Sequence, residues 1–310
     1  MKISIIGSGA MGSLFGGKLA SAGHEVMLYD IFQEHVDTIN SKGVEIEELA
    51  TGEKEIFKPS ATSDPAKAAD ADVLIIFVKS TATEAVSKQF KAVVSGNPLV
   101  ITLQNGVGNE DILRKTFGGE NTAAGVTSQG ATFAGPGKIR HAGNGPTYLC
   151  ISEGDNSRLA PLIEALNQAG FETKVEENIG NLVWSKLIIN VGINALTALT
   201  GLENGRLVDF EELKEIMKDL VSEALEVAQA KGIHITYPDP LATVYDVCVK
   251  TAKNRSSMLQ DFDRGTMSEI DFINNAIVRE AGKLGIQVPV NKTLARLVKS
   301  LDLHHQEEKA

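Results

Sequence analysis

The chain has 310 residues, of which 43% are hydrophobic and 23% charged, so it is long enough for two folded domains of ordinary composition. Its net charge of −10 argues against nucleic-acid binding, which needs a basic face, and no apolar run reaches the roughly 18 residues of a bilayer span without a charged or polar interruption. The first residues lack the features of a signal peptide, and the two cysteines show neither metal spacing nor a disulfide framework, so we expect a cytoplasmic protein with no metal site.

The start of the chain carries a dinucleotide-binding pattern. Segments 2–6 and 25–29 predict buried parallel strands, and 13–22 predicts the helix between them. A G-x-G-x-x-G motif joins the first strand to the helix, and Asp30 ends the second strand. In this context the glycines allow a tight turn and bring a pyrophosphate close to the helix N-terminus. We therefore expect the cofactor to contact Gly7, Ser8, Gly9, Ala10, Met11 and Gly12.

Asp30 bears on the kind of dinucleotide. Its carboxylate can accept hydrogen bonds from the adenosine ribose, and it would repel a 2′-phosphate. No Arg or Lys stands between Ile31 and Glu34 to hold that phosphate. The residues therefore favour NAD(H) over NADP(H).

Strands and helices continue to alternate up to residue 178. Segments 72–78 and 99–103 predict further buried strands, and Lys79 and Asn105 follow them. Ligands of parallel sheets bind beyond the carboxyl ends of the strands, so both side chains are candidates to face the cofactor. A solvated lysine and a turn-forming Asn-Gly pair explain them equally well. The glycine-rich stretch 125–145 is expected to be extended, and strands at 147–152 and 171–175 around a helix at 159–169 should finish the sheet.

A helical period replaces this alternation after residue 178. The fold class is therefore an α/β Rossmann-type domain, 1–178, followed by an all-helical domain, 179–310. The long amphipathic pattern at 209–231 could dock a second chain or only its own domain, which leaves a homodimer open. Besides the apolar helix at 182–199, the predicted helices span 209–231, 241–253, 256–263, 268–284 and 293–301.

The helix predicted at 182–199 is apolar on almost every side, yet it carries Lys186, Asn190 and Asn194 at spacings of four residues. Helical neighbours three and four residues apart share a face, so these residues form one polar stripe. A buried polar group without a partner costs roughly 1–3 kcal/mol, and a charge costs more. Either protein partners satisfy the polar stripe or it lines a cavity for a polar ligand, and the register of three such residues favours a ligand site.

With these pieces placed, the chain resembles a ketopantoate reductase (2-dehydropantoate 2-reductase) over nearly its whole length. The resemblance implies a Rossmann domain and a helical domain that reduce 2-dehydropantoate to (R)-pantoate, in pantothenate and coenzyme A biosynthesis, by hydride transfer from NAD(P)H. The marks of the resemblance are 7–12, 104–108, 184–187 with Asn190 and Asn194, 203–205, 256–261 and 269–274.

The family pattern also implies roles for single residues. It makes Lys186 the proton donor to the ketone oxygen, and it places Glu269 at the cofactor and substrate as a second catalytic residue. Glu269 read by itself could be a first-turn acid favoured by the helix dipole. The pattern implies that the substrate is held by Asn105, Asn190, Asn194, Asn204 and Ser257, and that the cofactor is contacted by Lys79, Asn105, Ala131 and Glu269 as well as by the glycine motif.

The chain departs from the family pattern at the second strand. Many members have an Arg just past this strand that grips the NADPH phosphate, and here Asp30 and Ile31 stand in that region. The resemblance still allows NADP(H), but the chain is also similar to NAD-dependent relatives that reduce other branched or aromatic 2-keto acids. An (R)-2-hydroxy acid dehydrogenase is therefore the alternative function. A non-catalytic NAD(P) sensor is a remote one, because it predicts a degraded polar stripe.

Overall fold

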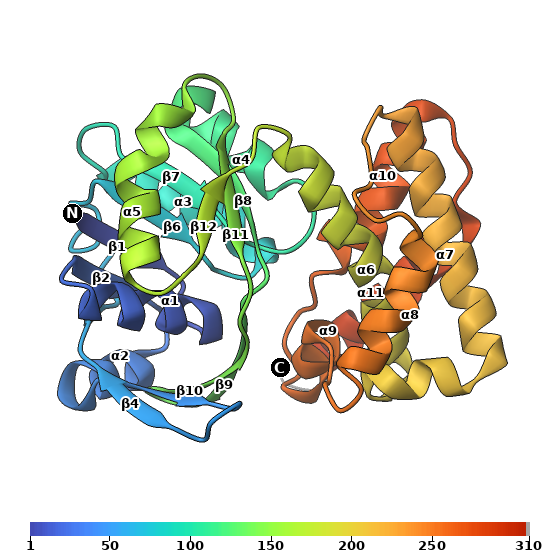
Figure 1. Ribbon diagram of the computed structural model, residues 1–310, viewed down its shortest axis with the longest axis horizontal. Helices are drawn as coiled ribbons and strands as arrows, with labels where there is room; N and C mark the ends of the chain where they lie inside the picture. The colour runs from blue at the N-terminus through green and yellow to red at the C-terminus, as the bar shows by residue number, and fades with distance from the viewer. Residues whose placement is uncertain (308–310) are drawn as a thin grey trace. The chain divides into compact units, whose positions relative to one another are not determined.

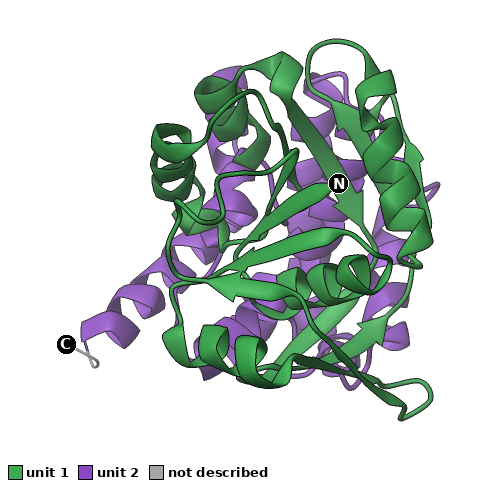
Figure 2. Cartoon of the chain, turned by 90° about the vertical axis from the view of Figure 1, so that its left-hand side faces the viewer, with its two compact units in different colours: residues 1–104, 109–179 green, residues 105–108, 180–310 purple. Residues whose placement is uncertain are grey.

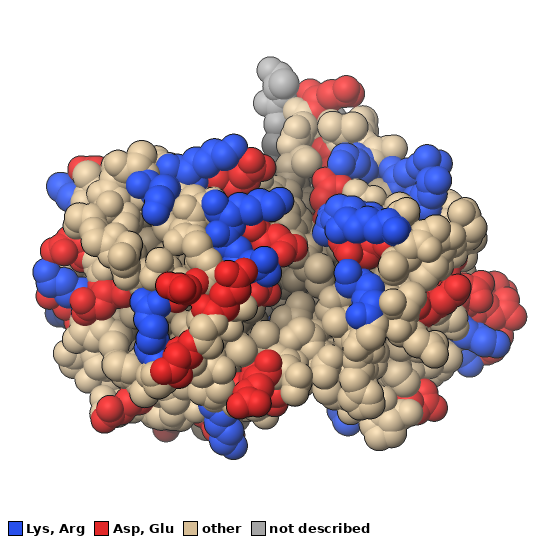
Figure 3. Space-filling model, turned by 90° about the horizontal axis from the view of Figure 1, so that it is seen from above, with Lys and Arg blue, Asp and Glu red and all other residues tan. Residues whose placement is uncertain are grey.

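The computed structural model describes residues 1–307, and the chain separates into two compact units (Figures 1 and 2). Unit 1 holds residues 1–104 and 109–179. Unit 2 holds the loop 105–108 and the chain from residue 180 onward. Figure 3 shows acidic and basic side chains interspersed over the face that it presents, so this face has no basic surface of the kind that nucleic acid requires.

Unit 1 is built on an eight-stranded sheet in the order β12-β11-β8-β7-β6-β1-β2-β5. Neighbouring strands from β5 to β8 are parallel, β11 is antiparallel to β8, and β12 is parallel to β11. The order of the strands reverses at β1, and ligands of open α/β sheets bind at such a switch point. The strands are β1 (Lys2–Ile6), β2 (Glu25–Tyr29), β5 (Ser60–Thr62), β6 (Val73–Ile76), β7 (Leu99–Thr102), β8 (Thr122–Thr127), β11 (Thr147–Ile151) and β12 (Thr173–Val175).

Helices cover both faces of this sheet because successive strand residues point to opposite sides. Ile5 packs in a cluster with Phe15 of one helix, whereas Ile6 packs in another cluster with Phe90. This two-sided burial confirms the predicted Rossmann-type fold. The first face is covered by α1 (Ala10–Ser21), α2 (Gln33–Lys42) and α5 (Ala160–Gln168), and the second by α3 (Thr83–Val93) and α4 (Asn109–Phe117), with short 3-10 turns η1 (Ser80–Ala82), η2 (Gly119–Asn121) and η3 (Asn156–Leu159).

A second sheet in unit 1 was not foreseen from the sequence. It has the order β4-β3-β10-β9 and packs against α1, where a Cβ on Gly17 would lie 3.1 Å from Phe57 Cβ. Its strands are short and carry many charges, so their apolar alternation is weak; the sequence indicated only an extended stretch within 125–145. The strands are β3 (Val44–Glu48), β4 (Lys54–Phe57), β9 (Gly130–Gly135) and β10 (Lys138–Gly143).

Unit 2 is helical and is organised around α6 (Ile179–Thr200). By length and composition alone α6 could cross a membrane, but Leu187, Ile188 and Val191 lie in the hydrophobic core of unit 2. The prediction of a buried helix is therefore confirmed. The surrounding elements are η4 (Asn204–Asp209), α7 (Glu211–Ala230), α8 (Pro240–Lys250), α9 (Ser257–Asp263), η5 (Ile270–Phe272), α10 (Asn274–Leu284) and α11 (Pro289–Glu307).

Two predicted helices differ from the structure. The helix expected at 268–284 is broken at Ile273, where φ is −112° and ψ is −100°, and α10 begins only at Asn274. A tertiary contact holds the start of this segment, because a side chain of α11 binds the backbone N–H and the hydroxyl of Ser268. The last helix is longer than the predicted 293–301, since Pro289 begins α11 instead of preceding it. Proline is tolerated there because first-turn N–H groups have no helical partner.

Candidate active site

The glycine turn, residues 7–12, joins β1 to α1 at the switch point of the sheet. Gly7 has a φ of +99°, and a Cβ on it would lie 2.6 Å from Val78 N. A Cβ on Gly12 would lie 2.0 Å from Gly7 O, so no side chain fits there either. A Cβ on Gly9 would meet nothing within 4 Å. Two glycines thus let the backbone pack closely, and the third leaves open the space that a pyrophosphate would need.

Asp30 is bonded to the glycine turn. Its Oδ2 accepts hydrogen bonds from the backbone N–H of Ser8, at 2.8 Å, and from the Ser8 hydroxyl, at 3.1 Å. Its Oδ1 accepts the N–H of Phe32 at 3.0 Å. These three donors are neutral, and no Lys or Arg side chain within residues 1–307 pairs with the carboxylate. Asp30 therefore has a structural role that was not apparent from the sequence.

His35 of α2 holds the same turn from behind and was not identified from the sequence. Its side chain is buried, and Nδ1 accepts the N–H of Gly137 at 2.9 Å. The ring proton therefore sits on Nε2, which donates to Ser8 O at 2.7 Å. The hydroxyl of Ser13 also donates to Ser8 O, at 2.6 Å. A histidine on a short polar helix carries no local signal of this role, because its partners are distant in the chain.

Three further cofactor candidates lie on separate elements. Lys79 follows β6 and is exposed, and Ala131 lies in β9, where it pairs with His141 of β10. Asn105 lies in the loop that groups with unit 2. That loop is closely packed, since a Cβ on Gly106 would lie 2.3 Å from Phe272 O. The candidates of the glycine turn, Lys79 and Ala131 thus belong to unit 1, whereas Asn105 belongs to unit 2.

The polar stripe of α6 binds the start of α9. Asn194 is 6% exposed, and its Nδ2 lies 3.5 Å from the Oγ of Ser257. One helical turn further, the hydroxyls of Thr197 and Ser256 are 2.6 Å apart. Unit 2 therefore brings together Asn194 and Ser257, two of the predicted substrate-binding residues.

Four buried side-chain atoms in the described part of unit 2 have no hydrogen-bond partner, and two of them belong to predicted substrate-binding residues: Nδ2 of Asn190 and Oδ1 of Asn204. The other two are Oδ1 of Asn274 and Nδ1 of His305. The orientation of the Asn204 amide follows from its neighbours. Thr251 donates its hydroxyl to Val247 O at 2.7 Å, so it accepts the Nδ2 of Asn204 at 2.9 Å. Among the predicted substrate-binding residues, this leaves one donor on Asn190 and one acceptor on Asn204 without a hydrogen bond to offset their burial, which favours a bound ligand with both an acceptor and a donor.

Lys186 and Glu269 form the charged part of the site. Burial lowers the pKa of Lys186 to about 8, and the negative charge of Glu269 partly offsets this by raising it. Glu269 is 7% exposed and precedes η5, and its side chain caps no helix. Because it lies outside the first turn of α10, the helix-dipole explanation of this residue was wrong. An ammonium with a pKa of about 8 is a good proton donor near neutral pH.

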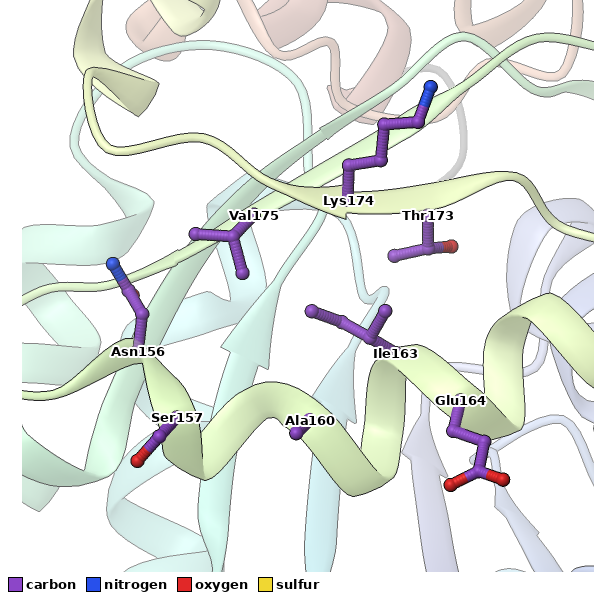
Figure 4. Close-up of a pocket in the computed structure, with 8 residues that line it drawn as sticks. All are labelled: Asn156, Ser157, Ala160, Ile163, Glu164, Thr173, Lys174 and Val175. Atoms are coloured by element: carbon purple, nitrogen blue, oxygen red, sulfur yellow. The ribbon is translucent and has the colours of Figure 1, made fainter.

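A hollow elsewhere on unit 1 lacks this chemistry. It lies between α5 and the edge strand β12, and Figure 4 shows the charged ends of Glu164 and Lys174 pointing away from it. Asn156 at its rim is occupied by the N–H of Ile151. In the described part of the chain, residues 1–307, no group of three His, Cys, Asp or Glu side chains could hold a metal ion.

The sheet order and the glycine turn are those of a dinucleotide-binding protein, and the relatives of the chain define it as an oxidoreductase that acts on CH–OH groups. The chain belongs to the ketopantoate reductase family: residues 3–154 match "Ketopantoate reductase PanE/ApbA" and residues 178–302 match "Ketopantoate reductase PanE/ApbA C terminal".

Known relatives resemble the chain over nearly its full length. A 2-dehydropantoate 2-reductase of Halobacterium salinarum is 35% identical over 96% of this chain and 98% of its own. The crystal structure of a PanE/ApbA family ketopantoate reductase from Ralstonia eutropha is 37% identical, with a TM-score of 0.90 over 99% of this chain and 100% of that one. A ternary structure of D-mandelate dehydrogenase with NADH and anilino(oxo)acetate is 29% identical, with a TM-score of 0.91 and the same coverage.

The open space at Gly9 makes a separable prediction. Gly9→Val should fold with an unchanged melting temperature, because nothing lies within 4 Å of the added Cβ. It should abolish NADH binding, because the side chain fills the space of the pyrophosphate. Fluorescence titration measures the binding, and Gly282→Ala, also in open space but on α10, is the control. Full NADH affinity in Gly9→Val would contradict the role of the glycine turn.

Proposed function

We propose that the chain reduces 2-dehydropantoate to (R)-pantoate with a nicotinamide dinucleotide. The observation that carries this proposal is the buried ammonium of Lys186 on the polar stripe of α6, one helical turn from Asn190, whose buried Nδ2 lacks a hydrogen-bond partner. The names of the relatives support the same substrate.

The chemistry follows from the charge that develops on the substrate. A bound nicotinamide would supply hydride to the keto carbon, and negative charge would then build on the ketone oxygen. We assign Lys186 to stabilise that charge and to give its Nζ proton to the oxygen. Glu269 keeps the ammonium protonated, because its charge opposes the effect of burial on the pKa of Lys186.

The substrate would be held by the amides of unit 2. The free Nδ2 of Asn190 suits a carboxylate or ketone oxygen, and the free Oδ1 of Asn204 suits a hydroxyl group. 2-Dehydropantoate carries such a hydroxyl, whereas a mandelate-type 2-keto acid does not. The acceptor on Asn204 therefore favours 2-dehydropantoate as the substrate. The likeness to D-mandelate dehydrogenase supports the alternative function, an (R)-2-hydroxy acid dehydrogenase.

A comparison of substrates tests this assignment. The wild type should have a higher kcat/KM for 2-dehydropantoate than for 3,3-dimethyl-2-oxobutanoate, which lacks only the hydroxyl. Asn204→Ala should lower kcat/KM about tenfold to a hundredfold for the first and little for the second, because one buried hydrogen bond is lost. A wild type that prefers phenylglyoxylate would support the alternative function, and one that reduces no 2-keto acid would support a dinucleotide sensor.

The titration of Lys186 gives a second prediction. The rate of reduction should fall as pH rises through about 8, because the deprotonated amine has no proton to give. Lys186→Ala should lose this dependence and about 10²–10⁴ in kcat, while NADH binding is retained. Steady-state rates measured from about pH 6 to about pH 10, a range that brackets this pKa, give both the loss of kcat and the change in its pH dependence. A variant with near wild-type kcat would rule out Lys186 as the proton donor.

We further propose that the enzyme prefers NADH to NADPH. Asp30 is charged, and no Lys or Arg side chain within residues 1–307 pairs with it. A phosphate charge 4 Å away would be repelled by about 1 kcal/mol in water and about 4 kcal/mol at a dielectric of 20. This corresponds to a preference of roughly tenfold to a thousandfold. The NADH in the related D-mandelate dehydrogenase structure is consistent with the proposal.

Two substitutions test the cofactor preference. Ile31 is 84% exposed, so Ile31→Arg should fold normally and raise kcat/KM for NADPH by placing a cation near the phosphate. Asp30→Ala should reduce the ratio of kcat/KM for NADH to kcat/KM for NADPH. It should also weaken the binding of both cofactors, because Asp30 holds Ser8 of the glycine turn. Ile31→Gln, a polar residue without charge, is the control for Ile31→Arg. A wild type with a higher kcat/KM for NADPH would overturn the proposal.

A further inference from the structure

The carboxylate of Asp302 is buried in the last helix without a cationic partner in the described chain, residues 1–307. It is 2% exposed and accepts two hydrogen bonds, both from Ser268: the backbone N–H at 3.0 Å and the hydroxyl at 2.7 Å. A buried carboxylate satisfied only by neutral donors is destabilising relative to an apolar residue. Because Ser268 directly precedes Glu269, this arrangement fixes the backbone at Glu269.

The same helix holds the other side of Glu269. Lys299, one turn before Asp302, binds both carboxylate oxygens of Asp271 at 2.8 and 3.0 Å. Residues three apart on a helix share a face, so Lys299 and Asp302 contact the segment on either side of Glu269. The Lys299 pair is exposed and contributes little by itself, whereas the Asp302 contact is buried.

The segment held in this way also contacts the loop that contains Asn105. The carbonyl of Phe272 accepts the N–H of Val107 at 2.9 Å. Arg279 binds the carbonyls of Asp271 and Val107, each at 3.2 Å. Segment 268–272 is therefore bound by side chains of α11 on one side. On the other side it is hydrogen-bonded to the loop 105–108.

We propose that Asp302 is a positioning residue, which acts through Ser268 to hold Glu269 in place and, through Phe272, the loop of Asn105. The inference rests on the proposed role of Glu269 and extends it to a helix that contributes no predicted site residue. The broken helix is part of this device, since the bonds from Asp302 hold Ser268 outside α10 and leave Glu269 on a short 3-10 turn.

Asp302→Asn tests the proposal. The amide keeps the shape of the side chain, but its Nδ2 cannot accept the Ser268 hydroxyl, which must rotate and accept instead, and the charged acceptor of the Ser268 N–H becomes a neutral one. The hold on Ser268 is weakened, so Glu269 should shift. A displacement of about 1 Å in an active site lowers turnover about a hundredfold, and we expect a kcat loss of that order with little change in NADH affinity. The alkaline fall in rate should also move to lower pH, because Glu269 then raises the pKa of Lys186 less.

Two variants of Ser268 grade the effect. Ser268→Ala removes one of the two bonds and should cause a smaller loss of kcat with the same direction of pH shift. Ser268→Thr keeps the hydroxyl, so its kcat should be close to that of the wild type and higher than that of Ser268→Ala. The matched control is Glu223→Gln, because Glu223 accepts the N–H groups of Val290 and Asn291 at the opposite end of α11. This control should lower the melting temperature and leave kcat and its pH dependence unchanged.

One readout does not require turnover. The pKa of Lys186 can be followed by NMR of its side chain, assigned by the loss of the signal in Lys186→Ala. A lower pKa in Asp302→Asn than in the wild type supports the proposal even if no 2-keto acid is reduced, and that failure would count against the proposed function alone. An unchanged pKa and kcat in Asp302→Asn, or equal losses in Asp302→Asn and Glu223→Gln, would overturn the proposal.

Discussion

The ammonium of Lys186 is a charge carried into the core by helix α6, and its desolvation is the electrostatic constraint that the rest of unit 2 has to meet. An apolar core helix gains stability from burial, but it penalises the charged form of any lysine that it carries. The fold relieves this penalty only in part, by placing the charge of Glu269 nearby, and so the pKa of Lys186 falls to about 8. The same burial that makes α6 a core helix therefore lowers the pKa of its lysine. This is the property that the proposed role of Lys186 as proton donor would require.

In unit 1 the constraint is a different one: the glycine turn, residues 7–12, is held in place on one side and left open on the other. Gly7 and Gly12 allow the backbone to pack without side chains, and Gly9 keeps the space above it free. Asp30 and His35 then bind Ser8 through its N–H and its carbonyl. The turn is thus pre-organised by neighbours, and a dinucleotide would not have to order it. In the proposed cofactor site, the same carboxylate that orders the turn would also face the adenosine ribose.

Much of the fold followed from local patterns, since burial imposes a period of two on strands and 3.6 on helices. Six strands of the large sheet, α6 and α7 were predicted for this reason, whereas β5 and β8 were not predicted as strands. The second sheet was missed because charged residues such as Glu45 and Glu47 dilute its alternation. The break at Ile273 was missed because the residues around it favour a helix locally, and a bond from α11 overrides that preference.

The sequence by itself determined the glycine turn, the placing of Asp30 at the end of a strand, and the register of Lys186, Asn190 and Asn194 on one helix face. Each depends only on spacing along a single element. Tertiary structure decided which polar atoms remain without partners, how His35 supports the turn, and how Asp302 holds Ser268. These depend on contacts between residues far apart in the chain, such as His35 with Gly137. No local period encodes such a contact, because it exists only when separate elements pack together.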